Sequence, residues 1–190
     1  MSIKMQLKKL FRYSIISIVF LMACTNQTKD TLNENIDKRS PENDSLIYEV
    51  ARDIMRKAPN CALITVDGYN QPRVREMDAF EPEKDFTVWF GTNPNSRKVS
   101  QIRNNANVTL YYVAKNNEGY VSLQGVAELI NDEDLKQKYW KEEWTDFYPN
   151  QKEDYLLIKV TPKKMEVVSY PHKLLGETTT WEPPSVLFEK

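Results

Sequence analysis

The sequence contains little of what many common catalytic sites require. Its 190 residues include 5 glycines, 2 cysteines and a single histidine, His172. It has no GxGxxG, GxxxxGK(S/T), HExxH or CxxC segment, so dinucleotide-binding folds, P-loops, zincins and zinc knuckles are unsupported. A histidine-based triad or a multi-histidine metal site would depend on His172, which we interpret as a surface residue of the C-terminal tail.

An excess of charge of either sign is also missing. The 26 basic and 27 acidic residues leave a net charge of -1, so there is no general attraction to nucleic acid and any anion-binding site must be local. Hydrophobic residues make up 41% of the chain. That content suits one soluble domain with a buried core rather than a membrane protein with several spans.

The N-terminal segment has the pattern of an export signal. Basic residues precede the apolar run YSIISIVFLMA. This run is shorter than the roughly 20 apolar residues that a membrane-spanning helix needs. The run ends in LMAC, and this resembles the lipobox of bacterial lipoproteins, in which the signal is cleaved before a cysteine that is then acylated. We expect a signal peptide over residues 1–23 and a lipid anchor on Cys24. The alternative is an ordinary signal peptide or an uncleaved anchor.

Residues 24–43 are polar and contain no aromatic residue, so they cannot bury enough surface to fold alone. We interpret them as a flexible tether that links the bacterial envelope membrane to a domain over residues 44–190. With Cys24 lipidated, Cys61 has no partner in the chain and no internal disulfide is expected. Cys61 begins the apolar run CALITV and is predicted to be a buried, unreactive thiol.

Beyond residue 44 the apolar pattern predicts a mainly β, α+β domain. Helices are predicted over residues 44–58, 96–105 and 132–148, and strands over residues 61–67, 71–80, 85–92, 107–114, 119–130, 154–162 and 164–170. Val74 and Glu76 are expected on one face of their strand, with Arg75 and Met77 near the other. Gly125 is expected at a bulge or at a close approach of the backbone, and the tail after Pro171 is expected to be irregular. Short antiparallel strands without βαβ alternation indicate a barrel or a barrel-like domain.

One segment, FGTNPNSRK at residues 90–98, gathers polar and cationic side chains between a predicted strand and a predicted helix. Ser96, Arg97 and Lys98 fall in the first helical turn, where free N–H groups and the helix dipole favour an anion. Arg75 on a neighbouring strand can add a bidentate contact. The pattern predicts a phosphate site, although an ordinary helix start with solvated charges would look the same.

The order of these segments resembles the split-barrel, flavin-binding family of pyridoxamine phosphate oxidase-like proteins. The likeness is carried by PRVREM, DFTVWFGTNPNSRKVSQIRNNANVTLYY and YVSLQGVAELI. KYWKEEWTDFYP followed by DYLLIKVTPKKMEVV is similar to the general-stress-protein branch of that family. The resemblance implies an antiparallel split β-barrel with short peripheral helices. It also implies a homodimer with flavin mononucleotide (FMN) at its interface.

The family's cofactor-binding positions can be matched residue by residue. The matching residues are Arg75, Met77, Gly91, Thr92, Ser96, Arg97, Lys98 and Tyr120. Arg75 and the Ser-Arg-Lys run match the phosphate clamp, and Met77, Gly91 and Thr92 match the strands beside the flavin. Tyr120 departs from the pattern, since the oxidases often have a glutamine there.

The resemblance implies an FMN-dependent oxidoreductase that takes hydride from a donor such as a nicotinamide and has an unknown substrate. The tail LLGETTTWEPPSVLFEK has no counterpart of the oxidases' substrate-binding segment, so oxidation of pyridoxamine phosphate is not expected. No catalytic residue is assigned. The alternatives are a non-catalytic binder of flavin, haem or another ligand, and a scaffold with no ligand. Trp140, Trp144, Phe147 and Tyr148 either cover the flavin or pack in the core or dimer interface.

The lipobox predicts the behaviour of a Cys24→Ser variant. Without the thiol, acylation should be lost, and the protein should remain uncleaved at the membrane or be released from it. Incorporation of labelled fatty acid measures this directly. Equal labelling of the wild type and the variant would show that the lipid is not attached at Cys24.

Overall fold

The computed structural model describes residues 41–188 of the chain. The expected signal peptide over residues 1–23, the anchor on Cys24 and nearly all of the tether lie outside the described residues and stay predictions. Within the described part, no helix is both long enough and apolar enough to cross a membrane.

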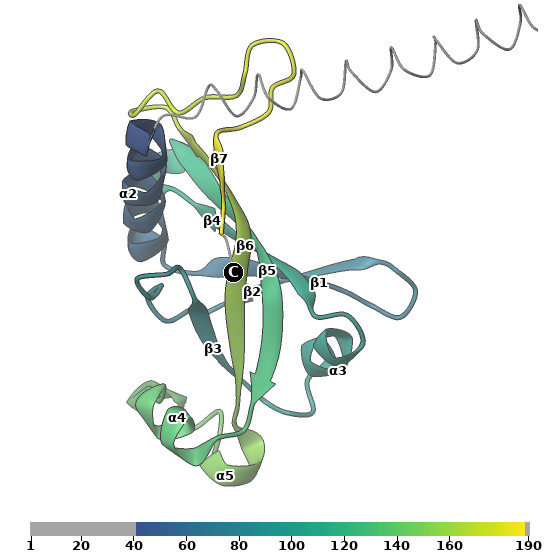
Figure 1. Ribbon diagram of the computed structural model, residues 1–190. Coiled ribbons are helices and arrows are strands. Elements are labelled where there is room, and N and C mark those ends of the chain that lie inside the picture. Colours follow the sequence, from purple (N-terminus) through teal and green to yellow (C-terminus); the bar gives the residue numbers. More distant parts are fainter. Residues whose placement is uncertain (1–40, 189–190) are drawn as a thin grey trace, which may run out of the picture. The chain divides into compact units, whose positions relative to one another are not determined.

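Seven antiparallel strands curl into a half-barrel with short helices around it (Figure 1). The strands are β1 (Cys61–Val66), β2 (Pro72–Met77), β3 (Val88–Thr92), β4 (Asn107–Val113), β5 (Gly119–Ile130), β6 (Leu156–Ser169) and β7 (Ser185–Leu187). Their order in space is β2-β1-β4-β5-β6-β3, and β7 pairs with β6. An isolated bridge between Ala79 and Phe90 links the chain after β2 to β3, so the two ends of the sheet approach each other. The predicted antiparallel split barrel is confirmed.

The helices lie around the sheet, with α2 toward one end and α4 and α5 at the other (Figure 1). They are α2 (Pro41–Lys57), α3 (Arg97–Asn104), α4 (Glu133–Lys138) and α5 (Gln151–Asp154), with 3-10 turns η1 (Lys115–Asn117) and η2 (Glu142–Trp144). The single helix predicted over residues 132–148 is wrong, because α4 stops at Lys138. Tyr139 instead stacks on Trp89 of β3 with a centroid distance of 4.5 Å, so an aromatic contact overrides the local helix propensity.

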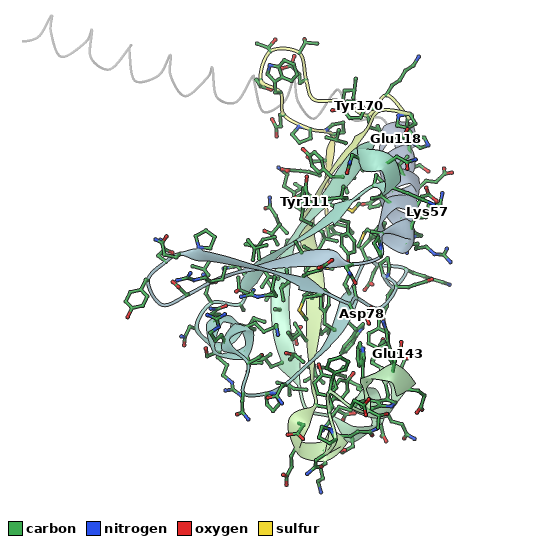
Figure 2. All side chains as sticks on the ribbon, turned by 180° about the vertical axis from the view of Figure 1, so that it is seen from behind. Lys57, Asp78, Tyr111, Glu118, Glu143 and Tyr170 are labelled. Carbon is green, nitrogen blue, oxygen red and sulfur yellow. The ribbon has the colours of Figure 1, made fainter. Side chains whose placement is uncertain are left out.

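The sheet has a buried inner face and a partly exposed outer face. Every second residue of β1, from Cys61 onward, is buried, and the residues between are half-buried. Leu63 pairs with Arg75 in the β1–β2 ladder, so Arg75 lies on the inner face, opposite to Val74, and the predicted separation of these two residues is confirmed. Val74 lies on the outer face with 65% of its surface exposed. Tyr111 of β4 lies on the same outer face (Figure 2).

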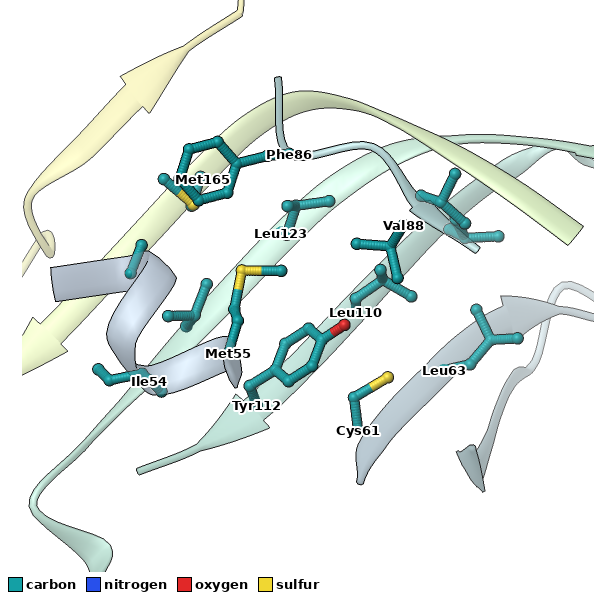
Figure 3. Close-up of a cluster of buried hydrophobic side chains, with 14 of the residues drawn as sticks. Ile54, Met55, Cys61, Leu63, Phe86, Val88, Leu110, Tyr112, Leu123 and Met165 are labelled. Carbon is teal, nitrogen blue, oxygen red and sulfur yellow. The ribbon is translucent and has the colours of Figure 1, made fainter. Parts of the chain in front are cut away.

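The main core lies between the inner face and α2 (Figure 3). Ile54 and Met55 of α2 pack there with Leu123 of β5 and Met165 of β6. Such burial contributes about 25 cal/mol per Å² of apolar surface removed from water. Cys61 is also buried in this core, and its burial raises the pKa of the thiol to about 12. The predicted burial of Cys61 is confirmed, and a buried thiol with a raised pKa stays protonated, as expected of an unreactive cysteine.

The long strand β6 corrects a second prediction. Proline has no N–H to donate, so the sequence pattern suggested two strands separated near Pro162, yet β6 is continuous. The β5–β6 register shifts between Gln124 and Gly125, opposite Pro162, so the missing donor falls at an irregular point of the ladder. A Cβ on Gly125 would lie 2.5 Å from the carbonyl oxygen of Thr161. The predicted bulge is confirmed, and it requires glycine.

The C-terminal tail was predicted to be irregular, but part of it forms the strand β7. β7 pairs with β6, with Val186 opposite Met165, and the Phe188 N–H donates to the Lys163 carbonyl oxygen at 3.0 Å. Val186 is buried. A strand of three residues is too short to give a clear alternating pattern, which explains why the sequence did not reveal it.

Candidate functional site

The turn between β3 and α3 holds most of the predicted phosphate-binding residues. The Ser96 N–H donates to the Asn93 carbonyl oxygen at 3.0 Å, and the Asn95 N–H donates to the Asn93 side-chain oxygen at 2.9 Å. Ser96 has extended backbone just before α3 begins at Arg97, but its side chain makes no capping hydrogen bond. The Ser96 side chain thus leaves the positive end of this helix uncapped, and N–H groups at such an end favour an anion.

Thr92, Ser96 and Lys98 form a hydrogen-bonded group at this turn. Lys98 Nζ donates to Thr92 Oγ1 at 3.1 Å, and Ser96 Oγ lies 3.1 Å from the same atom. Whichever hydroxyl donates in the second contact, the proton of the other hydroxyl stays available to a further acceptor. The group therefore presents an ammonium and a hydroxyl donor side by side.

Arg75 joins this region from β2. Its Nη1 donates to the Leu63 carbonyl oxygen at 3.2 Å and to Thr65 Oγ1 at 2.7 Å, and its Nη2 donates to Gln101 Oε1 at 2.8 Å. Gln101 belongs to α3 and follows Lys98 by three residues, so both lie on the same side of the helix. The contact with Gln101 therefore holds the guanidinium against the helix that carries Lys98.

Arg75, Arg97 and Lys98 form a cation cluster. Burial, followed by the charge of Arg97, lowers the pKa of Arg75, and burial, followed by the charge of Arg75, lowers the pKa of Lys98. Among the side chains described for residues 44–188, no carboxylate forms an ion pair with any of the three. The neighbouring positive charges disfavour one another, and an anion at this place would relieve that repulsion.

Gly91 and Met77 are close in sequence to the clamp residues: Gly91 precedes Thr92 in β3, and Met77 follows Arg75 by two residues in β2. A Cβ on Gly91 would stand 2.5 Å from both Trp144 Cζ3 and Tyr155 Cε2, so the glycine lets two aromatic rings contact β3 directly. Met77, at the end of β2, is half-buried and packs against the main core. Gly91 is therefore covered by the two rings, and Met77 is partly covered by the main core.

The rings over Gly91 belong to a second buried group, the aromatic cluster. It consists of Trp89, Tyr139, Trp144, Tyr155 and Leu157, with Phe80, Ile130, Leu135, Trp140 and Tyr148 partly buried against it. Glu83 Oε1 accepts from Trp89 Nε1 at 3.2 Å and from the Tyr139 hydroxyl at 2.5 Å. The packing interpretation therefore holds for Trp140, Trp144 and Tyr148, whereas Phe147 is exposed.

Two other candidate residues lie away from the cation cluster. Tyr120 pairs with Val113 across the β4–β5 ladder, and its ring lies 5.2 Å from the ring of Tyr111 on the outer face. His172 is exposed in the tail, as predicted, and its Nδ1 lies 2.8 Å from Ser169 Oγ. Across the described part of the chain, no group of three or more His, Cys, Asp or Glu side chains is placed to hold a metal ion.

Sequence reasoning missed Thr65 and Gln101. Both are buried, and the Thr65 hydroxyl donates to Gln101 Oε1 at 2.6 Å. Two signals were present. Thr65 is a polar residue at an inward-facing position of β1, and Gln101 is three residues from Lys98 in α3. Neither signal indicates which residue Thr65 or Gln101 would bond, because β1, β2 and α3 meet only in the folded chain.

Comparison with known proteins identifies a family. A family model described as pyridoxamine 5'-phosphate oxidase like matches residues 48–177. No curated protein matches the sequence at a significant level.

Solved structures of similar fold include two from the general-stress-protein group. General stress protein 26 from Bacillus anthracis is 24% identical, with a TM-score of 0.59 over 74% of this chain and 98% of that chain. A protein from Clostridium acetobutylicum that is related to general stress protein 26 is 17% identical, with a TM-score of 0.60 over 74% of this chain and 94% of that chain. At these identities the structures support the fold alone.

The contact of Gly91 with the aromatic cluster predicts that Gly91→Ala destabilises the protein. The new methyl group would force Trp144 and Tyr155 to shift, and overpacking of this kind costs about 1–3 kcal/mol of unfolding free energy. Denaturant unfolding of the full-length protein measures the loss. Gly68→Ala is the matched control, because nothing lies within 4 Å of a Cβ at Gly68. Equal stability of both variants would contradict the close packing over β3.

Proposed function

Because the chain belongs to the pyridoxamine 5'-phosphate oxidase-like family, we propose that it binds FMN and serves as a flavin-dependent oxidoreductase. The observation that carries this proposal is the cation cluster. Arg97 and Lys98 begin α3, Arg75 is hydrogen-bonded to Gln101 of the same helix, and none of the three has a carboxylate partner among the side chains described for residues 44–188. Cations that stay close together without a counter-ion are best explained by an anionic ligand.

The donors present suit the phosphate of FMN. A phosphate group carries nearly two negative charges at neutral pH and offers three strong acceptor oxygens. Arg75, Arg97 and Lys98 supply the positive charge, and Ser96 with Thr92 supplies a hydroxyl proton. The start of α3 adds backbone N–H groups. In this proposal Met77, Gly91 and Thr92 form the nearby strand surface against which the flavin ring lies.

We further propose that the protein is a homodimer and that the partner completes the flavin site. The support is the apolar outer face, where Val74, Val113 and Tyr111 are 65%, 44% and 36% exposed. Tyr120 lies on this face and away from the cation cluster of its own chain. Contact between two outer faces would bury these side chains. Tyr120 would then lie at the interface, close to the partner.

The chemistry of the proposed enzyme comes mainly from the cofactor. Bound FMN supplies hydride and electron transfer, taken from a reduced donor such as a nicotinamide. The residues of this chain bind and orient the phosphate end, and the aromatic cluster supports β3 from the opposite side. The residues around the clamp include no histidine or carboxylate that we assign as a general acid or base. The substrate that receives the electrons is therefore left open.

We propose that the domain is tethered to a membrane of the bacterial cell envelope through a lipid on Cys24. The support is the LMAC segment, which follows a basic and then an apolar run. An exported location also favours a second candidate, a lipoprotein that holds flavin without turning it over, since FMN must be supplied outside the cytoplasm. Bleaching of the flavin by a nicotinamide, followed by multiple turnovers, would identify the enzyme, and binding without turnover would identify the carrier.

The phosphate assignment predicts selective loss of FMN affinity in Arg75→Ala and Lys98→Ala. Hydrogen bonds to charged groups are worth about 1.5–3 kcal/mol, so each change should weaken FMN binding roughly tenfold to hundredfold. Riboflavin, which lacks the phosphate, should bind almost as before. Losses in the double variant should be less than additive if both groups contact one phosphate. Fluorescence titration of both flavins measures these affinities.

Circular dichroism of the same variants checks that they remain folded. Equal losses for FMN and riboflavin, or no loss for either, would show that the Ser-Arg-Lys run is an ordinary helix start with solvated charges. A wild type that binds neither flavin would remove the proposed function altogether.

The homodimer proposal predicts that Val113→Lys yields monomers with weakened FMN binding. A charge in an apolar interface must be desolvated without a partner, which opposes association. Size-exclusion chromatography with light scattering measures the mass, and flavin titration measures the affinity. Phe147→Lys is the control, because Phe147 is exposed on a separate part of the surface, beyond η2. A Val113→Lys protein that stays dimeric would place the interface elsewhere.

A further inference from the structure

Arg75, Thr65 and Gln101 form a closed hydrogen-bonded triangle. Arg75 Nη1 lies 2.7 Å from Thr65 Oγ1, Arg75 Nη2 lies 2.8 Å from Gln101 Oε1, and Thr65 Oγ1 lies 2.6 Å from Gln101 Oε1. Thr65 has no exposed surface and Gln101 is nearly buried. The two oxygens therefore present a fixed pair of acceptors to the end of the guanidinium.

The chemistry of the triangle allows one arrangement of its protons. Arginine only donates, so Thr65 Oγ1 accepts from Arg75 and gives its own proton to Gln101 Oε1. Gln101 Oε1 accepts from both partners, which directs the side-chain NH₂ of Gln101 away from the guanidinium. A neutral pair thus holds the arginine while leaving its positive charge uncompensated.

Within the described part of the chain, one edge of the Arg75 guanidinium has no acceptor. Both protons of Nη1 are used by the Leu63 carbonyl oxygen and Thr65, and one proton of Nη2 is used by Gln101. Among the residues that the structure describes, the Arg75 Nε–H makes no hydrogen bond. The Nε–H and the remaining Nη2–H lie on the same edge and point the same way. Such an edge matches two oxygens of a phosphate.

The same contacts hold two like charges together. Gln101 and Lys98 lie on the same side of α3, so an arginine held by Gln101 also stays near Lys98. Burial, followed by the charge of Arg75, lowers the pKa of Lys98. A long, flexible side chain would otherwise turn toward solvent to reduce the repulsion, because its rotamers are freely accessible when nothing restrains them.

We propose that Thr65 and Gln101 are positioning residues, which hold the Arg75 guanidinium so that its Nε edge faces the bound phosphate. They act through Arg75 and need not touch the ligand. The identity of that ligand rests on the proposed FMN function, whereas the restraint on Arg75 is a property of the protein alone.

The restraint can be measured without any flavin, on full-length protein labelled with nitrogen-15. In the wild type, rotation of the Arg75 guanidinium should be slow, with separate NMR signals for its Nη protons. In Thr65→Val, which keeps the shape and removes the hydroxyl, the signals should merge as rotation becomes faster. Thr65→Ser, which restores a hydroxyl, should recover separate signals. Thr109→Val is the matched control, since Thr109 lies on the outer face of the same sheet.

Flavin titration then tests the consequence for binding. Thr65→Val should weaken FMN binding roughly threefold to tenfold, the effect expected for one lost hydrogen bond, with riboflavin unchanged. Gln101→Glu should keep Arg75 restrained but neutralise its charge with a carboxylate, so FMN should be weakened more than in Thr65→Val. A general packing defect would affect both flavins equally and would not be rescued by Thr65→Ser.

The outcomes separate this inference from the proposed function. Fast guanidinium rotation in the wild type, or unchanged rotation in Thr65→Val, would overturn the positioning role whatever FMN does. Separate wild-type signals that merge in Thr65→Val, in a protein that does not distinguish FMN from riboflavin, would support the restraint and refute phosphate as its target. If Thr65→Val does not fold, Gln101→Leu, which removes the other acceptor, takes its place. Rotation of the Arg75 guanidinium should then become faster, and unchanged rotation would overturn the positioning role.

Discussion

The antiparallel pairing of β5 with β6 is the interaction on which the rest of the structure depends. Residues Gly119–Ile130 pair with the strand Leu156–Ser169 along nearly its whole length, and the other strands are added on either side. β4 and then β1 and β2 extend from β5, while β3 and β7 pair with β6. The clamp residues of β2 and of the β3–α3 turn therefore come from opposite ends of the strand order. They meet only because the sheet curls.

The bulge at Gly125 is part of how the sheet curls. A bulge increases local twist and bends the strand that contains it, and Pro162 lies opposite the register shift. On the N-terminal side of Pro162, β6 pairs with β3. Phe90 of β3 in turn forms a bridge with Ala79, in the chain after β2. An irregularity in the central ladder thus helps to bring Arg75 close to the helix that begins after β3.

The site combines positive charge with neutral support. Arg75 is held by oxygens that carry no net charge, and Lys98 is held by the Thr92 hydroxyl. Carboxylates in the same positions would stabilise the unliganded protein but would compete with an anion. Burial, followed by the charge of a neighbouring arginine, lowers the pKa values of Arg75 and Lys98. On the other side of β3, the aromatic cluster packs directly against Gly91 and limits how far the strand can move.

The sequence by itself determined the class of fold, the placement of Arg75 on the strand face opposite Val74, the irregularity at Gly125 and the start of α3. These features depend on local periodicity, on glycine's small size and on helix-start chemistry, all of which act over a few neighbouring residues. The tertiary structure alone decided that α4 stops at Lys138, because the ring of Tyr139 stacks on a residue 50 positions earlier in the chain. It also decided that β6 passes through Pro162 without a break and that Thr65 and Gln101 hold Arg75. Each of these depends on contacts between segments far apart in the chain, and no local pattern specifies which distant residue will be the partner.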